Sequence, residues 1–288
     1  MSRYVYVNGR NVPYAEASVH AEDRGNQFGD AIYEVCEVLG GRLIDETRHL
    51  DRLDRSLREL KIEAPMTRPS WNRVLREVIR RNRLTDGSLY LQVSRGARPR
   101  EFLFAPEGSV APTVIVIARG HDRAANEARA EDGIAVISVP DNRWDRCDIK
   151  TVMLLPASMA KEKAKAVGAK EAWLVDETGK VTEGASSNAW IITNDGRLVT
   201  RAPGNEILRG VTRTTLIDLL KREGLTLEER AFTIDEAKAA REAFITSAGS
   251  IVMPVVRIDG QSIGNGAPGI LSMQLRAAFH EVAETAPA

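Results

Sequence analysis

The sequence has few cysteines and no excess charge of either sign. It contains two cysteines, Cys36 and Cys147, among 288 residues. Two cysteines cannot make the disulfide framework of a small secreted protein, so we expect reduced thiols in a cytoplasmic protein. Lys and Arg number 40 and Asp and Glu number 40, which gives a formal net charge of zero. This balance argues against a nucleic-acid partner, because binding to the phosphate backbone usually requires a basic excess.

Long apolar runs and metal signatures are also missing. No stretch approaches the roughly 18–20 apolar residues that a membrane helix needs, and the N-terminal residues lack the apolar core of a signal peptide. The four histidines are far apart, and none has a metal-ligand spacing with cysteine or another histidine. Gly-x-Gly-x-x-Gly and Walker-type loops do not occur. We therefore predict no membrane partner and no metal, and a function that lies in a small-molecule site.

Strand, turn and helix patterns alternate along the chain. Residues 4–7 run into Asn8-Gly9 and residues 32–39 into Gly40-Gly41, which predicts two hairpins. Leucines at helical spacing predict a helix around residues 50–60, and a second apolar face predicts another over 71–79. Many further turn signals favour mostly antiparallel sheets with helices packed on them. A polar segment predicts a linker over 121–132, between domains at 1–120 and 133–288.

Two stretches carry candidate chemistry around a lysine and a carboxylate. Lys150 follows Ile149 at the start of an apolar run. It is either a surface lysine beside a buried strand or an amine partly withdrawn from water, which suits Schiff-base chemistry. Glu183 precedes small and hydroxylic residues that include Ser187. This second stretch is either a turn or a negative charge placed beside a cofactor ring.

Two further stretches could bind an anion. Gly210, Val211 and Thr212 open an amphipathic helix, and the exposed N–H groups of a helix N-terminus bind phosphate. The alternative is an ordinary capped helix. Residues 246–250 are either a turn or a second arm of the same cradle. A reactive lysine, a carboxylate for a ring nitrogen and a phosphate site are together what pyridoxal 5'-phosphate requires.

Five motifs in this order resemble the class IV aminotransferases, the fold-type IV pyridoxal-phosphate enzymes. They are FGDAIYEV at 28–35, HLDRL at 49–53, RWDRCDIK at 143–150, TEGASSN at 182–188 and LRGVTR at 208–213. The resemblance covers nearly the whole chain and is greatest to bacterial D-amino-acid transaminases. It implies an α+β fold with a small N-terminal α+β domain and a larger C-terminal pseudo-barrel domain. It also implies a homodimer in which the partner subunit completes the site.

The resemblance also implies a role for each matched residue. Lys150 would form the Schiff base with the cofactor and move the α-proton, and Glu183 would keep the ring nitrogen protonated. Leu208 would pack against the ring, and Tyr33 would lie on the substrate side. Arg52, Val211 and Thr212 would bind the phosphate, and Ser187, Ser247 and Ala248 would also bind the cofactor.

The loop that recognises the substrate carboxylate departs from the resemblance at one position. D-specific members use an arginine and a histidine two residues apart, on a loop that reaches in from the neighbouring subunit, and Arg100 and Phe102 occupy these positions. The missing hydrogen bond is worth about 1–3 kcal/mol; Arg98 either compensates for it or is a solvated loop residue. The implied reaction converts D-alanine and 2-oxoglutarate to pyruvate and D-glutamate. Branched-chain L-amino-acid aminotransferase and aminodeoxychorismate lyase remain as alternatives.

Overall fold

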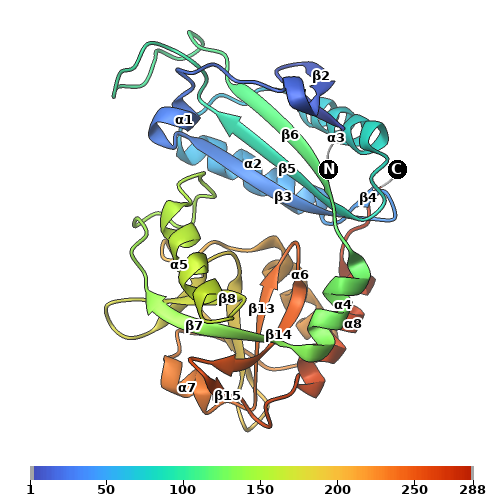
Figure 1. Ribbon diagram of the computed structural model, residues 1–288, viewed down its shortest axis with the longest axis vertical. Helices are drawn as coiled ribbons and strands as arrows, with labels where there is room; N and C mark the ends of the chain where they lie inside the picture. The colour runs from blue at the N-terminus through green and yellow to red at the C-terminus, as the bar shows by residue number, and fades with distance from the viewer. Residues whose placement is uncertain (1–2, 287–288) are drawn as a thin grey trace. The chain divides into compact units, whose positions relative to one another are not determined.

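The computed structural model describes residues 3–286, which divide into two compact units (Figure 1). Within these residues, the N-terminal unit comprises 3–123, 149–153 and 284–286, and the C-terminal unit comprises 124–148 and 154–283. The chain thus leaves the C-terminal unit for the five residues around Lys150 and then returns to it. Each unit contains a sheet with helices, which confirms the predicted α+β class.

The sheet of the N-terminal unit is antiparallel and, within the described residues, has the strand order β2-β1-β6-β5-β3-β4. The first predicted hairpin is confirmed, because Asn8 and Gly9 adopt φ angles of 44° and 91° between β1 and β2. The second is confirmed at Gly40-Gly41, between β3 and β4. The strands are β1 (Tyr4–Val7), β2 (Arg10–Pro13), β3 (Ala31–Leu39), β4 (Arg42–Leu43), β5 (Gly87–Ser94) and β6 (Thr113–Gly120).

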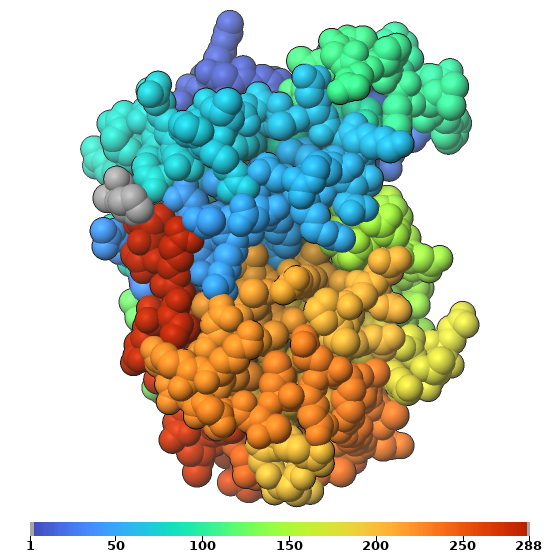
Figure 2. Space-filling view, turned by 180° about the vertical axis from the view of Figure 1, so that it is seen from behind, coloured from blue at the N-terminus to red at the C-terminus, as the bar shows by residue number. Residues whose placement is uncertain are grey.

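Two long helices, both predicted from their apolar periodicity, supply the core of this unit. Leu50, Leu53 and Leu57 from α2 are almost fully buried, as are Trp71 and Leu75 from α3. Burial of each such side chain contributes about 1.5–3 kcal/mol to folding. The blue-to-cyan surface in Figure 2 is formed by these helices. The helices of the unit are α1 (Arg24–Phe28), α2 (Glu46–Glu59) and α3 (Arg68–Asn82), with a 3-10 turn η1 (Tyr14–Glu16).

The sheet of the C-terminal unit is mixed. Its order in the described residues is β12-β11-β10-β13-β14-β7-β8-β9, and β15 pairs with β14. The sequence favoured mostly antiparallel sheets, but the pairs β7–β8, β7–β14 and β11–β12 are parallel. Helix α5 forms the crossover between β7 and β8, and α6 forms the crossover between β11 and β12. The strands are β7 (Ile134–Pro140), β8 (Glu171–Val175), β9 (Val181–Gly184), β10 (Asn188–Ile192), β11 (Leu198–Thr200), β12 (Leu227–Glu229), β13 (Glu242–Ser247), β14 (Ile251–Ile258) and β15 (Gln261–Ser262).

Helix α4 occupies most of the segment predicted as a linker. Of its residues, only Ala130 is buried. The polar residues are exposed or half-buried, and such a composition is also typical of an exposed linker. Glu127 pairs with Arg276 of α8 at 2.9 Å, and α4 belongs to the C-terminal unit from Ala124 onwards. The domain boundaries at 120 and 133 stay a prediction. The helices of this unit are α4 (Arg123–Asp132), α5 (Leu155–Ala166), α6 (Val211–Arg222), α7 (Ile234–Lys238) and α8 (Ile270–Val282).

Candidate active site

Lys150 lies in a short extended segment beside β3 of the N-terminal unit. The Tyr33 N–H donates to the Lys150 carbonyl at 2.9 Å, and Ile32 forms a bridge with Thr151. The ammonium of Lys150 lies 4.1 Å from the centroid of the Tyr33 ring. Tyr33 therefore holds the backbone of this half-buried lysine by a hydrogen bond and its side chain by a ring contact.

The Tyr33 ring is itself held by a second tyrosine. Tyr33 stacks on Tyr90 of β5 with centroids 5.5 Å apart and an interplanar angle of 27°. The Tyr90 hydroxyl donates to Gln92 Oε1 at 2.7 Å. Burial, assisted by the neighbouring Tyr33, raises the pKa of Tyr90 to about 12. The phenol therefore stays neutral, and the stacked pair forms a fixed support for Lys150.

Arg52 is paired with a buried carboxylate of the same unit. Its Nε and Nη2 donate to Glu34 Oε1 and Oε2, each at 2.7 Å, and His49 Nδ1 lies 2.8 Å from Oε2. Burial alone would raise the pKa of Glu34, but Arg52 and His49 outweigh it and hold the pKa at about 2. Glu34 thus fixes the orientation of the Arg52 guanidinium. Phosphate binding by Arg52 stays a prediction.

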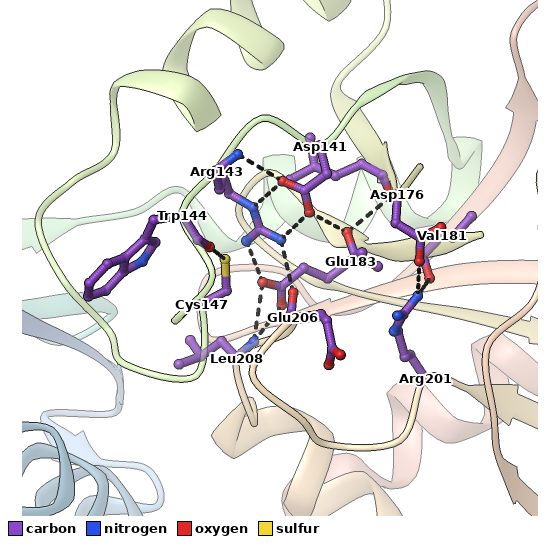
Figure 3. Close-up of polar contacts among 12 residues, drawn as sticks. Asp141, Arg143, Trp144, Cys147, Asp176, Val181, Glu183, Arg201, Glu206 and Leu208 are labelled. Carbon is purple, nitrogen blue, oxygen red and sulfur yellow. Dashed lines mark hydrogen bonds and ion pairs between the residues drawn. The ribbon is translucent and has the colours of Figure 1, made fainter. Parts of the chain in front are cut away.

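Glu183 is the centre of a polar cluster in the C-terminal unit (Figure 3). Its carboxylate is buried, with 4 % of the residue exposed. Oε1 accepts from Arg143 Nη1 at 2.6 Å, and Oε2 accepts from Asn188 Nδ2 at 3.0 Å. The Leu208 N–H lies 3.2 and 3.1 Å from the two oxygens. Three donors from three segments therefore fix the position of this carboxylate.

Arg143 connects Glu183 to a second carboxylate. Its Nε and Nη2 donate to Asp141 at 2.9 and 2.8 Å, and the Thr182 hydroxyl donates to the same carboxylate at 2.7 Å (Figure 3). Although burial works against both charges, these contacts lower the pKa of Asp141 and raise the pKa of Arg143. The Glu183 carboxylate is therefore held beside a positive charge that is itself fixed by Asp141.

Asn188 joins the Glu183 cluster to the N-terminus of α6. Its Nδ2 also donates to the Leu208 carbonyl at 2.9 Å. Gly210 is the N-cap of α6, and a Cβ there would lie 2.2 Å from Asn188 Oδ1, so the close approach requires glycine. The N–H groups of Val211 and Thr212 lie in the first helical turn, where no intrahelical acceptor exists. Such a terminus suits a phosphate.

Two loops with hydroxyl groups lie at the same end of the sheet. Asn188 pairs with Thr246 across β10 and β13, so residues 247–250 adjoin residues 186–188. The hydroxyls of Ser186 and Ser187 donate to Glu171 Oε2 at 2.7 and 3.2 Å, and Glu171 is almost fully buried. Glu171 therefore sets the direction of both hydroxyls. In the second loop, Ser247 and Ala248 are half-buried.

The structure thus groups the predicted site residues in two sets. Asn188 links Glu183 to Leu208 and the start of α6, whereas Lys150 is linked to Tyr33 in the other unit. The remaining candidates of the N-terminal unit are Arg52, Arg98 and Arg100. The sequence reasoning missed four polar residues that position others: Asp141, Arg143, Glu171 and Asn188. Arg143 and Asn188 lie inside the recognised motifs, which is the signal that could have identified them.

Neither a metal centre nor a membrane segment is evident in residues 3–286. No group of three His, Cys, Asp or Glu side chains among them could hold a metal ion. No helix in this range combines the length and the apolarity needed to cross a bilayer.

Comparison with known proteins defines the class. The sequence pattern of the family described as Amino-transferase class IV matches residues 31–258, and the chain belongs to this family. It is 37% identical over 282 residues to a D-alanine aminotransferase of Staphylococcus haemolyticus, with 98% of each chain covered. It is 38% identical over 284 residues to a D-alanine aminotransferase of Bacillus licheniformis, again with 98% of each covered.

Solved structures agree on the fold-type IV architecture. The branched-chain aminotransferase of Thermoproteus uzoniensis with norvaline gives a TM-score of 0.86 at 23% identity, covering 99% of each chain. A hypothetical aminotransferase of Mycobacterium tuberculosis in its PLP-bound form gives 0.83 at 22% identity, covering 97% of this chain and 98% of that one. The predicted fold class is therefore confirmed.

Proposed function

We propose that this chain is a pyridoxal-phosphate-dependent aminotransferase of D-amino acids. The reaction transfers the amino group of D-alanine to 2-oxoglutarate and yields pyruvate and D-glutamate. The observation that carries the proposal is the near full-length likeness to D-alanine aminotransferases, at 34–38% identity. Amino acids and 2-oxo acids are then its small-molecule partners. Homodimer formation and a cytoplasmic location belong to the same proposal.

The C-terminal unit has polar groups suited to the two polar ends of the cofactor, the ring nitrogen and the phosphate. Glu183 would present its carboxylate to a protonated ring nitrogen, and Arg143, Asn188 and the Leu208 N–H hold that carboxylate in place. The first turn of α6 offers N–H groups to a phosphate, and Asn188 links the two ends. When bound, the cofactor supplies an electron sink for the charge that develops at the amino-acid Cα.

The residues of this chain then have distinct tasks. Lys150 holds the cofactor covalently, and its amine accepts and returns the proton at the amino-acid Cα. Glu183 keeps the ring nitrogen protonated, and Arg143 holds the Glu183 carboxylate in place. Leu208 packs against the ring. The residues assigned to the phosphate are Arg52, Val211 and Thr212, and Ser187, Ser247 and Ala248 complete the cofactor-binding set.

The substrate side lies with residues of the N-terminal unit. Tyr33 supports Lys150, and the guanidinium of Arg100 binds the α-carboxylate through two parallel hydrogen bonds, a geometry that arginine favours. Arg98, half-buried in the same loop, adds positive charge. Branched-chain activity has weaker support, because the branched-chain structures are similar at only 22–25% identity. Aminodeoxychorismate lyase would differ by releasing pyruvate without an amino acceptor.

The test is a coupled assay of the purified holoenzyme with D-alanine, L-alanine and L-leucine. We expect turnover of D-alanine alone, and exclusive turnover of L-leucine would contradict the D-specific assignment. Lys150→Ala should abolish turnover, whereas Lys163→Ala, at an exposed position on α5, should not. Borohydride should fix the cofactor to the peptide that contains Lys150. Attachment at another lysine would refute the proposed catalytic residue.

A further inference from the structure

The loop that joins β5 to β6 presents apolar side chains to solvent. Phe102 and Leu103 are 73% and 74% exposed, and Phe104 is 54% exposed. Figure 2 shows the green residues of this loop as a lobe at the edge of the N-terminal unit. Although they are exposed, Phe102 and Phe104 each contact an arginine side chain.

Arginine and phenylalanine side chains alternate from the loop to the protein interior. The Arg100 guanidinium lies 5.2 Å from the centroid of the Phe28 ring and 5.3 Å from that of Phe102. The two rings meet edge to face, with centroids 5.5 Å apart and an interplanar angle of 70°. On the inner side, Arg24 lies 4.4 Å from Phe28, and Arg95 lies 3.7 Å from Phe104. We call Arg24, Phe28, Arg95, Arg100, Phe102 and Phe104 the arginine–phenylalanine stack.

The stack is anchored on one buried carboxylate. Arg24 Nε and Arg95 Nε both donate to Asp30 Oδ2 at 2.7 Å. Arg95 also donates to the carbonyls of Lys61 and Leu60 at 2.7 and 2.6 Å. Arg24 Nη1 donates to the carbonyl of Glu101, next to Arg100 in the loop. The loop is therefore fixed at its base by Arg95 and near its tip by Arg24.

An exposed arginine on a loop samples many rotamers. Binding a carboxylate selects one of them, and this loss of side-chain entropy weakens binding. Contact with two aromatic faces restricts the guanidinium before the carboxylate arrives, because cations are attracted to the ring face. A planar guanidinium held in this way is preorganised for two parallel hydrogen bonds. Leucine at position 28 or 102 would remove this attraction and keep an apolar side chain.

We propose that Phe28 and Phe102 are positioning residues that orient Arg100 for the substrate α-carboxylate. The Phe102 ring orients the Arg100 guanidinium, whereas a histidine at this position would donate a second hydrogen bond to the substrate carboxylate. This inference rests on the proposed function, because it takes the substrate to be an amino acid bound through Arg100.

The experiment measures carboxylate binding separately from turnover. Isobutyrate has the size and carboxylate of alanine but no amino group, so its Kd for the holoenzyme can be measured by calorimetry. We expect Phe102→Leu and Phe28→Leu each to raise this Kd about twofold to fivefold. The KM for D-alanine should rise in parallel while kcat stays nearly constant. Phe102→Tyr keeps the ring and should bind isobutyrate as the wild type does.

The matched control is Leu103→Ala, at a neighbouring position of the same exposure. It should change neither the isobutyrate Kd nor the melting temperature. An unchanged Kd in Phe102→Leu, or a Kd in Phe102→Tyr as weak as in Phe102→Leu, would overturn the inference. The inference would also be overturned if Arg100→Ala had the same isobutyrate Kd as the wild type. If the wild type binds isobutyrate through Arg100 but does not transaminate D-alanine, the proposed function fails and the Kd ratios still decide the role of the rings.

Discussion

Arg143 joins two carboxylates of the C-terminal unit, with Nη1 2.6 Å from Glu183 Oε1 and Nη2 2.8 Å from Asp141 Oδ2. All three side chains are largely buried. Removing the central charge would leave two carboxylates without their common partner, which is far more costly inside a protein than at its surface. The position and charge of Glu183 therefore depend on a residue that need not contact the cofactor.

Arg143→Met should weaken the cofactor site more than it weakens the fold. Without Arg143, the Glu183 carboxylate loses an ion pair that orients it and holds a protonated ring nitrogen less well. We expect kcat and cofactor retention to fall by roughly ten- to hundredfold, the usual cost of removing a residue that orients a binding side chain. Cofactor absorbance during dialysis and the D-alanine assay measure both. Arg197→Ala, in an exposed ion pair, is the control and should change little. Equal effects of the two substitutions would refute this role for Arg143.

Gly210→Ala tests the close approach at the start of α6. The added Cβ would lie 2.2 Å from Asn188 Oδ1, so Asn188 would have to leave Glu183 or the helix would have to shift. We expect a loss of about 1–3 kcal/mol in the free energy of unfolding, together with weaker phosphate binding. Urea unfolding and titration with pyridoxal 5'-phosphate are the measurements. Gly120→Ala, in β6, would bring its Cβ no closer than 3.9 Å to any residue beyond its chain neighbours, and it should be neutral; a neutral Gly210→Ala would contradict the packing argument.

Glu34→Gln should show a destabilisation that depends on pH. The pKa of Glu34 is about 2 in the folded protein, against an ordinary value of 4.5. Its charge therefore stabilises the fold above pH 4.5, and this contribution is lost as the pH falls from 4.5 towards 2. At pH 7 we expect the variant to lose about 3–5 kcal/mol in the free energy of unfolding, because the largely buried Arg52 guanidinium loses its ion pair with Glu34.

Urea unfolding of wild type and Glu34→Gln at pH 7, 5 and 3 measures this difference. The gap between them should narrow at pH 3. Glu77→Gln, in an exposed ion pair on α3, should differ little from the wild type throughout. A gap of constant size from pH 7 to pH 3 would show that the Glu34 charge is not its source.

Both cysteines should be unreactive in the native protein. Burial raises the pKa of Cys147 to about 12, and burial with the nearby Glu34 raises the pKa of Cys36 well above its ordinary value. The Cys147 thiol donates to the Trp144 carbonyl at 3.1 Å. At pH 8 the thiolate fraction of Cys147 is roughly a thousandfold below that of a free cysteine.

Iodoacetamide labelling at pH 8, followed by peptide mass spectrometry, tests this. Cys36 and Cys147 should alkylate slowly in the native protein and promptly in guanidinium chloride. Rapid native labelling of Cys147 would contradict its burial.

Local patterns predicted most regular elements but not the mixed sheet. The hairpins at Asn8-Gly9 and Gly40-Gly41 depend on neighbouring residues alone, and the structure confirms them. Parallel pairing, as between β7 and β8, depends on a crossover helix and on distant strands. Helix α4 was missed because it has little apolar surface to bury, so its sequence pattern is that of a solvated segment.

The candidate site was predictable where a motif shows the chemistry of a residue. Lys150 and Glu183 could be selected from the sequence, because an amine and a carboxylate have recognisable tasks. Arg143 and Glu171 were not selected, because an arginine or glutamate on its own is usually solvated. Only the fold shows that Glu171 is buried below two serine hydroxyls and that Arg143 lies between two carboxylates.

The N-terminal unit includes residues that follow the whole C-terminal unit in the sequence. The Asp45 N–H donates to the Glu284 carbonyl at 2.8 Å, and the Ala286 N–H donates to the Leu43 carbonyl at 2.9 Å. The segment with Lys150 is also missing from any fragment that stops near residue 123. During synthesis, the N-terminal unit therefore becomes complete only after the C-terminal unit has been made. This order differs from the usual one, in which the N-terminal domain folds first.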